Sequence, residues 1–114
     1  MNEQTHQSLI RKLVANARAI IIEEIGLSIG CSKMDKILFW LEPFEKINIE
    51  NIVIFKKYDE ESRFIPSGTA RLYCSKEAFQ KYDDALNSVN HKYRTKLMEV
   101  CFEIIEKYSV KKDI

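Results

Sequence analysis

The feature that most constrains the fold is a long apolar repeat in the C-terminal third of the chain. Its residues follow one another at spacings of 3, 4, 3, 4, 4, 3 and 4: Phe79, Tyr82, Leu86, Val89, Tyr93, Leu97, Val100 and Ile104. These spacings are typical of one face of an α-helix, and no Gly or Pro interrupts them. Ser75 is suited to be the N-cap, with Glu77 in the first turn. The repeat predicts a helix of about thirty residues, roughly 45 Å long.

A helix of this length exceeds what a small domain covers by itself. The chain has 114 residues, which predicts a single domain over 1–114, and we expect residues 109–114 to be a frayed tail. Either the long helix kinks near Asn87–Asn90, or part of its apolar seam faces a partner. A homodimer that uses this seam is therefore one hypothesis.

A second helical stripe lies near the N-terminus, which predicts a helix over about 5–25. Thr5 is its expected N-cap, and Gly26 its expected left-handed C-terminal residue. The stripe consists of Leu9, Ile10, Leu13, Val14, Ala17, Ile20, Ile21 and Ile25.

A third helix is predicted to start at Ser28 or Ser32 as N-cap and to end at Glu42-Pro43. Phe39 and Trp40 fall outside its inner face, so they either touch another element or stay partly exposed. The inner face is Met34, Ile37, Leu38 and Leu41. The predicted common core is Ile10, Leu13, Ala17, Ile21, Leu38, Leu86, Tyr93, Leu97 and Ile104.

The segment 47–66 fits two structures. Its apolar residues are compatible with one or two helical turns, but the β-branched "NIVIF" with "DEES" and "RFI" also fits a minimal hairpin. The predicted fold class is therefore mainly α: a small helical domain with a long C-terminal helix and a short irregular or minimal-hairpin connector.

The net charge, the length of the apolar runs and the cysteine content argue against several classes of function. The net charge is +1, which argues against non-specific nucleic-acid binding. There is no apolar run long enough to span a membrane. Three widely separated cysteines (Cys31, Cys74 and Cys101) and a polar N-terminus without the pattern of a secretory signal predict a cytoplasmic protein.

No constellation predicts catalysis, a metal or a cofactor. His6 and His91 lack further ligands at metal-binding spacing. No general base accompanies the cysteines, although Cys74 precedes a predicted helix N-terminus that would lower its pKa. We therefore expect a protein that is not an enzyme.

The remaining candidate site is an acidic connector. Residues 42–61 carry six acidic and three basic side chains, a local charge of −3 in a chain of +1. Aromatic residues beside charged ones are usable anchors at interfaces, and Pro66 restricts the connector. The predicted partner-binding residues are Glu45, Tyr58, Asp59, Glu60, Glu61 and Phe64. The alternative is a solvated connecting loop.

A resemblance to a family of proteins rests on two stretches of the chain. They are "ARAIIIEEIGLSIGC" (17–31) and "FKKYDEESRFIPSGTARLYCSKEAFQKYD" (55–83). They resemble an uncharacterised family of small bacterial cytoplasmic proteins, in which an ARA…E…G helix precedes a connector and a long C-terminal helix. Tyr73-Cys74 stands where that family has Trp. The matching residues are Arg18, Glu24, Gly30, Glu61, Pro66, Gly68 and Arg71.

Proteins of this kind include the immunity partners of secreted toxins, among them toxins of contact-dependent growth inhibition. The resemblance implies a protein that binds a toxin, expected to be basic, and occludes its active site. An acidic surface would accelerate such an encounter. The alternative is a small helical adaptor or regulatory homodimer that uses the seam of the long helix.

Overall fold

The computed structural model describes residues 3–65 and 75–109, and all regular elements in these ranges are helices. They are α1 (Glu3–Ile21), α2 (Leu27–Leu41), α3 (Ile54–Ser62) and α4 (Lys76–Tyr108). This confirms the mainly α fold with a long C-terminal helix. The segment with Pro66 and Gly68, and the tail beyond residue 109, lie outside the described residues.

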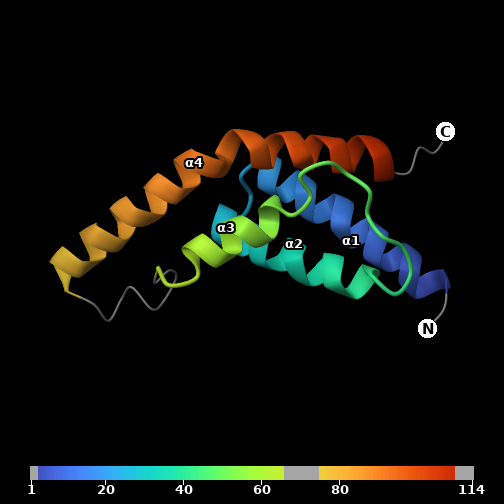
Figure 1. Cartoon of the computed structure of the whole chain (residues 1–114), viewed down its shortest axis with the longest axis horizontal. Helices are drawn as coiled ribbons and strands as arrows, with labels where there is room; N and C mark the ends of the chain where they lie inside the picture. Colours follow the sequence, from blue (N-terminus) through green and yellow to red (C-terminus); the bar gives the residue numbers. More distant parts are fainter. Residues whose placement is uncertain (1–2, 66–74, 110–114) are drawn as a thin grey trace.

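The core lies where α1, α2 and the C-terminal half of α4 pack together, with α3 closing one side (Figure 1). Leu13, Met34 and Leu97 are fully buried in it, one from each of the three longer helices. The short α3 adds Phe55 and Tyr58, which are also fully buried. Each helix therefore buries one apolar face, as amphipathic helices of a small globular protein do.

The predicted core is mostly correct. Leu13, Ala17, Leu97 and Ile104 are fully buried, while Ile10, Ile21, Leu38 and Tyr93 are half-buried and pack against them. Leu86 was predicted in the core but is only half-buried and lies outside the core cluster. It belongs to the half of α4 that extends beyond the other helices.

The turn between α1 and α2 differs from the prediction. The α1 helix ends at Ile21, and Glu23 (φ 61°) takes the left-handed position that was predicted for Gly26. The Glu24 N–H donates to Ala19 O and the Glu23 N–H to Ile20 O, which is the Schellman arrangement. These bonds satisfy carbonyls at the end of α1 and stop the helix four residues early.

The helix starts also differ from the prediction. Thr5 lies inside α1, which begins at Glu3, and Ser28 and Ser32 lie inside α2. The N-cap of α2 is Gly26, in an extended conformation and without a side-chain cap. In contrast, Ser75 caps α4 as predicted, because its Oγ accepts a hydrogen bond of 3.1 Å from the Ala78 N–H.

The helical alternative for the connector is confirmed, and the hairpin does not occur within 47–65. Ile47 and Ile49 are buried in an irregular stretch that leads from α2 to α3. Asn51 (φ 67°) turns the chain just before α3. The apolar side chains are used to cover the helical core rather than to pair strands.

The α4 helix is continuous over 33 residues and bends about midway along its length (Figure 1). Its buried residues all lie in the C-terminal half: Leu97, Val100, Cys101 and Ile104. The N-terminal half extends beyond the three shorter helices, so the molecule measures 51 × 28 × 21 Å. The long apolar seam is thus covered by α1 over one half only.

Candidate partner-binding surface

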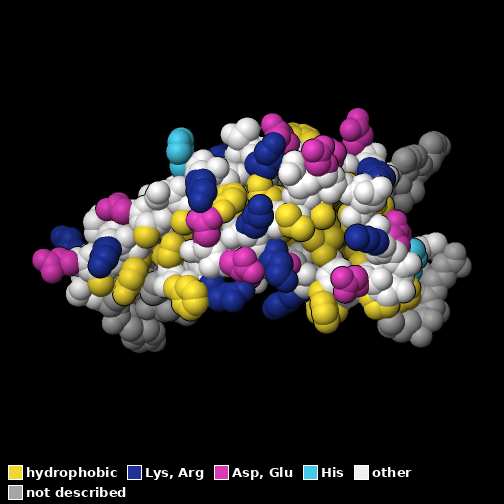
Figure 2. Space-filling model, in the orientation of Figure 1, with side chains coloured by type: hydrophobic (Ala, Val, Ile, Leu, Met, Phe, Trp, Pro, Cys, Tyr) yellow, Lys and Arg dark blue, Asp and Glu magenta, His cyan; other side chains and the backbone are white. Residues whose placement is uncertain are grey.

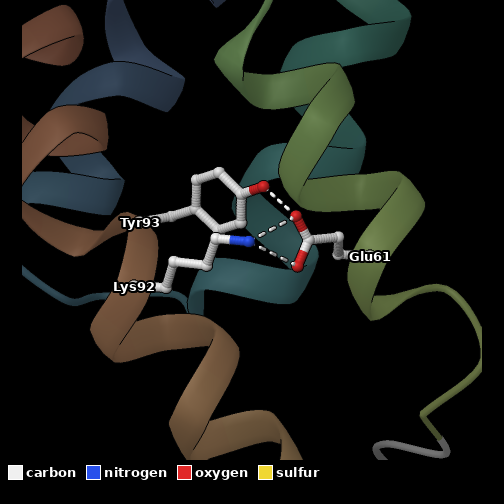
Figure 3. A network of polar contacts seen from close by, with 3 residues as sticks. All are labelled: Glu61, Lys92 and Tyr93. Atoms are coloured by element: carbon white, nitrogen blue, oxygen red, sulfur yellow. Dashed lines mark hydrogen bonds and ion pairs between the residues drawn. The ribbon is translucent and has the colours of Figure 1, made fainter.

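One acidic residue of α3, Glu61, is engaged within the molecule. Lys92 Nζ lies 3.2 and 3.0 Å from the two carboxylate oxygens of Glu61, and the Tyr93 hydroxyl donates a hydrogen bond to the same carboxylate (Figure 3). The hydrogen bonds from Tyr93 and from Lys92 hold the pKa of Glu61 below its ordinary value. The bond to Glu61 in turn raises the pKa of both Tyr93 and Lys92.

Two of the other predicted acidic residues also lie near basic side chains. Asp59 lies 3.8 Å from Arg63 one turn along, and Glu45 lies 2.8 Å from the His6 ring, which stacks on Phe44. Glu60 is exposed.

Residues 54–63 carry three acidic and three basic side chains, because Lys56, Lys57 and Arg63 offset Asp59, Glu60 and Glu61. Figure 2 shows acidic and basic side chains interspersed on the face it presents. The charge of α3 and its C-cap is therefore balanced, and the acidic excess of the connector lies before α3, where Glu42, Glu45 and Glu50 stand against Lys46.

The two predicted aromatic anchors have opposite environments. Tyr58 is fully buried, so the expectation that it contacts a partner is wrong in this conformation. Its hydroxyl donates to Asn90 Oδ1 and its ring packs edge-on to Tyr93, at 6.0 Å between centroids. Burial raises the pKa of this hydroxyl. Phe64, in contrast, is 86% exposed and stays a predicted anchor.

The burial of Tyr58 could have been found in the sequence. Phe55, Tyr58 and Ser62 recur at spacings of three and four, which is the pattern of one helix face, and all three are buried. That pattern was obscured because the segment also fits a hairpin with "NIVIF" as a strand and "DEES" as its turn.

A different exposed surface forms at the C-terminal end of α2. Phe39 is 71% exposed and Trp40 49% exposed, as one of the two alternatives from the sequence allowed. With Pro43 and Phe44 they line a shallow hollow of about 430 Å³, whose other lining residues are Thr5, Leu9 and Glu42. We call Phe39, Trp40, Pro43 and Phe44 the Trp40 surface. Large exposed aromatic side chains side by side are typical of protein interaction sites.

A groove between α1 and α2 adjoins the Trp40 surface, because Trp40 lines both. Its volume is about 550 Å³. The residues that line this α1–α2 groove are Lys12, Ala15, Asn16, Ala19, Glu24, Ile25, Lys33, Lys36, Ile37 and Trp40. Sequence reasoning missed it because its residues come from two helices, and only their packing brings them together.

The two cysteines in the described part of the chain do not have the environment of a nucleophile. Cys31 and Cys101 are buried, and burial raises the pKa of both thiols, to about 12 for Cys101. A nucleophilic cysteine needs the opposite shift. In residues 3–65 and 75–109 no three His, Cys, Asp or Glu side chains gather at a metal-binding distance. Cys74 lies outside these ranges.

None of the helices in the described residues is both long enough and apolar enough to cross a membrane. A scan against protein-family models, a search of curated proteins and a search of solved structures each return no match. The resemblance to immunity-type proteins therefore stays a prediction from the sequence.

Proposed function

We propose that this protein is a cytoplasmic, non-catalytic protein-binding domain whose principal contact is the Trp40 surface. The observation that carries the proposal is the exposure of Phe39 and Trp40 next to each other on a well-packed helix. Exposing two large aromatic side chains leaves apolar area in contact with water, and burying it against a partner is favourable by about 25 cal/mol per Å². Trp is also one of the residues enriched among interface hot spots.

The environment of this pair supports a binding role. Phe39 and Trp40 belong to a regular helix whose inner face is fixed by Met34 and Leu41, both fully buried. A preformed surface loses little conformational entropy on association. Lys36, Glu42 and Lys56 lie around a further hollow beside the pair, which gives the aromatic centre a polar rim.

The more specific form of the proposal is an immunity protein. It would bind a bacterial toxin and occlude the active site of that toxin, as the resemblance of residues 17–31 and 55–83 implies. A small, folded binding domain is suited to this task. The exposed Phe64 and Glu60 would then be secondary contacts to a basic toxin surface. The adaptor or homodimer alternative would use the seam of α4.

The test is co-purification from the native host with two variants beside the wild type. Wild-type protein, Phe39→Ser/Trp40→Ser and Phe102→Ser are each tagged and captured, and bound proteins are identified. Phe102 is an exposed aromatic residue on α4, so it controls for loss of surface hydrophobicity. We expect a partner that is enriched with wild type and Phe102→Ser but lost with the double variant.

The immunity form is tested by co-expressing that partner in bacteria. Growth should be protected by the wild-type chain and by Phe102→Ser, and not by Phe39→Ser/Trp40→Ser. A partner that binds all three proteins equally would reject the Trp40 surface. A partner whose expression does not affect growth would reject the immunity role and leave the adaptor alternative.

A further inference from the structure

The α1–α2 groove has an uneven distribution of charge. Lys12, Lys33 and Lys36 border it, against the single carboxylate of Glu24. All three lysines are exposed, and none of them forms an ion pair with another described residue. By contrast, several basic residues elsewhere are paired, among them Arg63, Lys92 and Arg94. The lining of the groove thus carries more cationic than anionic side chains.

The interior of the groove is apolar and has room for side chains. Ala15 and Ala19 lie one turn apart on α1, and their small side chains leave space in the groove. Ile25 and Ile37 supply larger apolar surface between the helices. An occupant that only carried negative charge would leave this apolar area unused.

The α2 wall of the groove is one continuous exposed stripe. Lys33, Lys36 and Trp40 follow one another at spacings of 3 and 4, so they lie on the same side of the helix. The stripe leads from the two lysines directly to the Trp40 surface. A ligand that binds there can therefore cover both features at once, which needs an occupant longer than a small molecule.

A polar group also faces the groove from its wall. Asn16 is buried, and its side-chain N–H donates to Gly30 O at 2.9 Å. Because a carbonyl oxygen only accepts hydrogen bonds, the Asn16 atom bonded to it is the amide nitrogen, Nδ2. The amide oxygen, Oδ1, is therefore not part of this bond. Oδ1 accepts no hydrogen bond from the described residues.

We propose that the α1–α2 groove binds an acidic amphipathic helix of the protein partner. Its apolar side chains would pack on Ala15, Ala19 and Ile37, while its Asp and Glu residues would pair with Lys33 and Lys36. This is the helix-in-groove mode of recognition, with charge fixing the orientation. The inference rests on the proposed function and deepens it, because it defines the chemistry of the partner segment beside the Trp40 surface.

The experiment selects binding peptides directly, so it does not require the partner to be identified first. A displayed library of helical peptides is panned against the wild-type chain after depletion on Ala15→Leu. Ala15 is exposed, so a leucine there fills the groove without entering the core. We expect the retained peptides to share an apolar stripe flanked by Asp or Glu. Retention of basic or neutral peptides, or of none, would overturn the inference.

A titration of the selected peptide then tests the lysines. Trp40 is the sole tryptophan of the chain, so its fluorescence reports directly on the groove. We expect Lys33→Gln/Lys36→Gln to weaken the affinity about tenfold, and the matched Lys57→Gln/Lys81→Gln to change it by less than about twofold. Added salt should weaken wild-type binding, because exposed charges are screened beyond about 8 Å at physiological ionic strength.

Three further outcomes test this inference, and the last two separate it from the proposed function. A single-stranded DNA oligonucleotide that shifts Trp40 fluorescence as strongly as the peptide would overturn the proposal in favour of a general anion surface. A captured partner that needs Phe39 and Trp40 but tolerates Ala15→Leu and Lys33→Gln/Lys36→Gln would reject the groove and retain the proposed function. Peptide binding that depends on the groove, with no partner that depends on Phe39 and Trp40, would reject the proposed function alone.

Discussion

At the scale of single residues, Gly30 shows how closely α1 and α2 approach each other. A Cβ atom at Gly30 would lie 2.5 Å from Ile20 Cγ1, and Ile20 is itself buried. An isoleucine on a helix has little freedom to rotate, so the clash cannot be relieved locally. The absence of a side chain at Gly30 is therefore what allows the two helices to pack with Asn16 bonded across them.

We predict that Gly30→Ala destabilises the protein by about 1–3 kcal/mol, in spite of the higher helix propensity of alanine. Chemical denaturation gives the free energy of unfolding. Gly26→Ala is the matched control, because nothing lies within 4 Å of a Cβ there and its φ of −69° suits alanine. Equal stability of Gly30→Ala and wild type would show that the helices are less closely packed than the structure has them.

The Glu61 network gives a second prediction at this scale. In Glu61→Gln the pKa of Tyr93 should fall toward its ordinary value of 10.0, because the carboxylate that accepts its hydrogen bond is gone. A spectrophotometric titration of the tyrosines, with Tyr93→Phe to assign the signal, measures this shift. Glu60→Gln makes the same charge change one residue away and should leave the titration unaltered.

The same network predicts a pH dependence of stability. Since the pKa of Glu61 is lower in the folded than in the unfolded chain, its contribution is present above the unfolded value and is lost as the pH falls through the folded one. The stability difference between wild type and Glu61→Gln should therefore be larger at neutral pH than in acid. A difference that is the same at both would mean that the carboxylate is not engaged in solution.

At the scale of elements, α4 consists of two halves that contribute differently to the fold. Its C-terminal half carries all of its buried residues, and its N-terminal half lies beyond the three shorter helices. Most helical stability in proteins comes from the packing of an apolar face rather than from the helix itself. The two halves should therefore respond differently to the same substitution.

Leu97→Ala is predicted to cost about 2–5 kcal/mol of unfolding free energy, since Leu97 is fully buried. Leu86→Ala removes the same atoms from a half-buried leucine in the N-terminal half of α4. Its cost in unfolding free energy should stay below about 1 kcal/mol. Urea denaturation of both variants measures the difference. Equal losses would place Leu86 in a buried contact and would support the hypothesis that its seam faces a partner copy.

At the scale of the whole molecule, the extension of α4 makes the protein elongated. The radius of gyration is 15.6 Å, whereas a compact domain of this length has about 13 Å. Because α1 already covers the buried half of the seam, we predict the mass of one chain in solution together with this large radius. Sedimentation equilibrium and small-angle scattering measure the two quantities. A doubled mass at micromolar concentration would favour the homodimer alternative.

The sequence determined the three longer helices of this protein, because apolar spacing and the cap at Ser75 are local properties of the chain, but it left α3 open between a helix and a hairpin. It placed the faces of α1, α2 and α4 and most of the core correctly. It did not determine where α1 stops, since the Schellman bonds at Glu23 compete with a helix that the apolar pattern alone would extend.

Only the tertiary structure decided which charged and aromatic residues are available to a partner. Glu61 meets Lys92 and Tyr93 across about thirty residues of sequence, and Tyr58 meets Asn90 over a similar separation. Such contacts depend on how the helices pack, which no local pattern records. For the same reason the α1–α2 groove, whose lysines come from two helices, exists only in the folded chain.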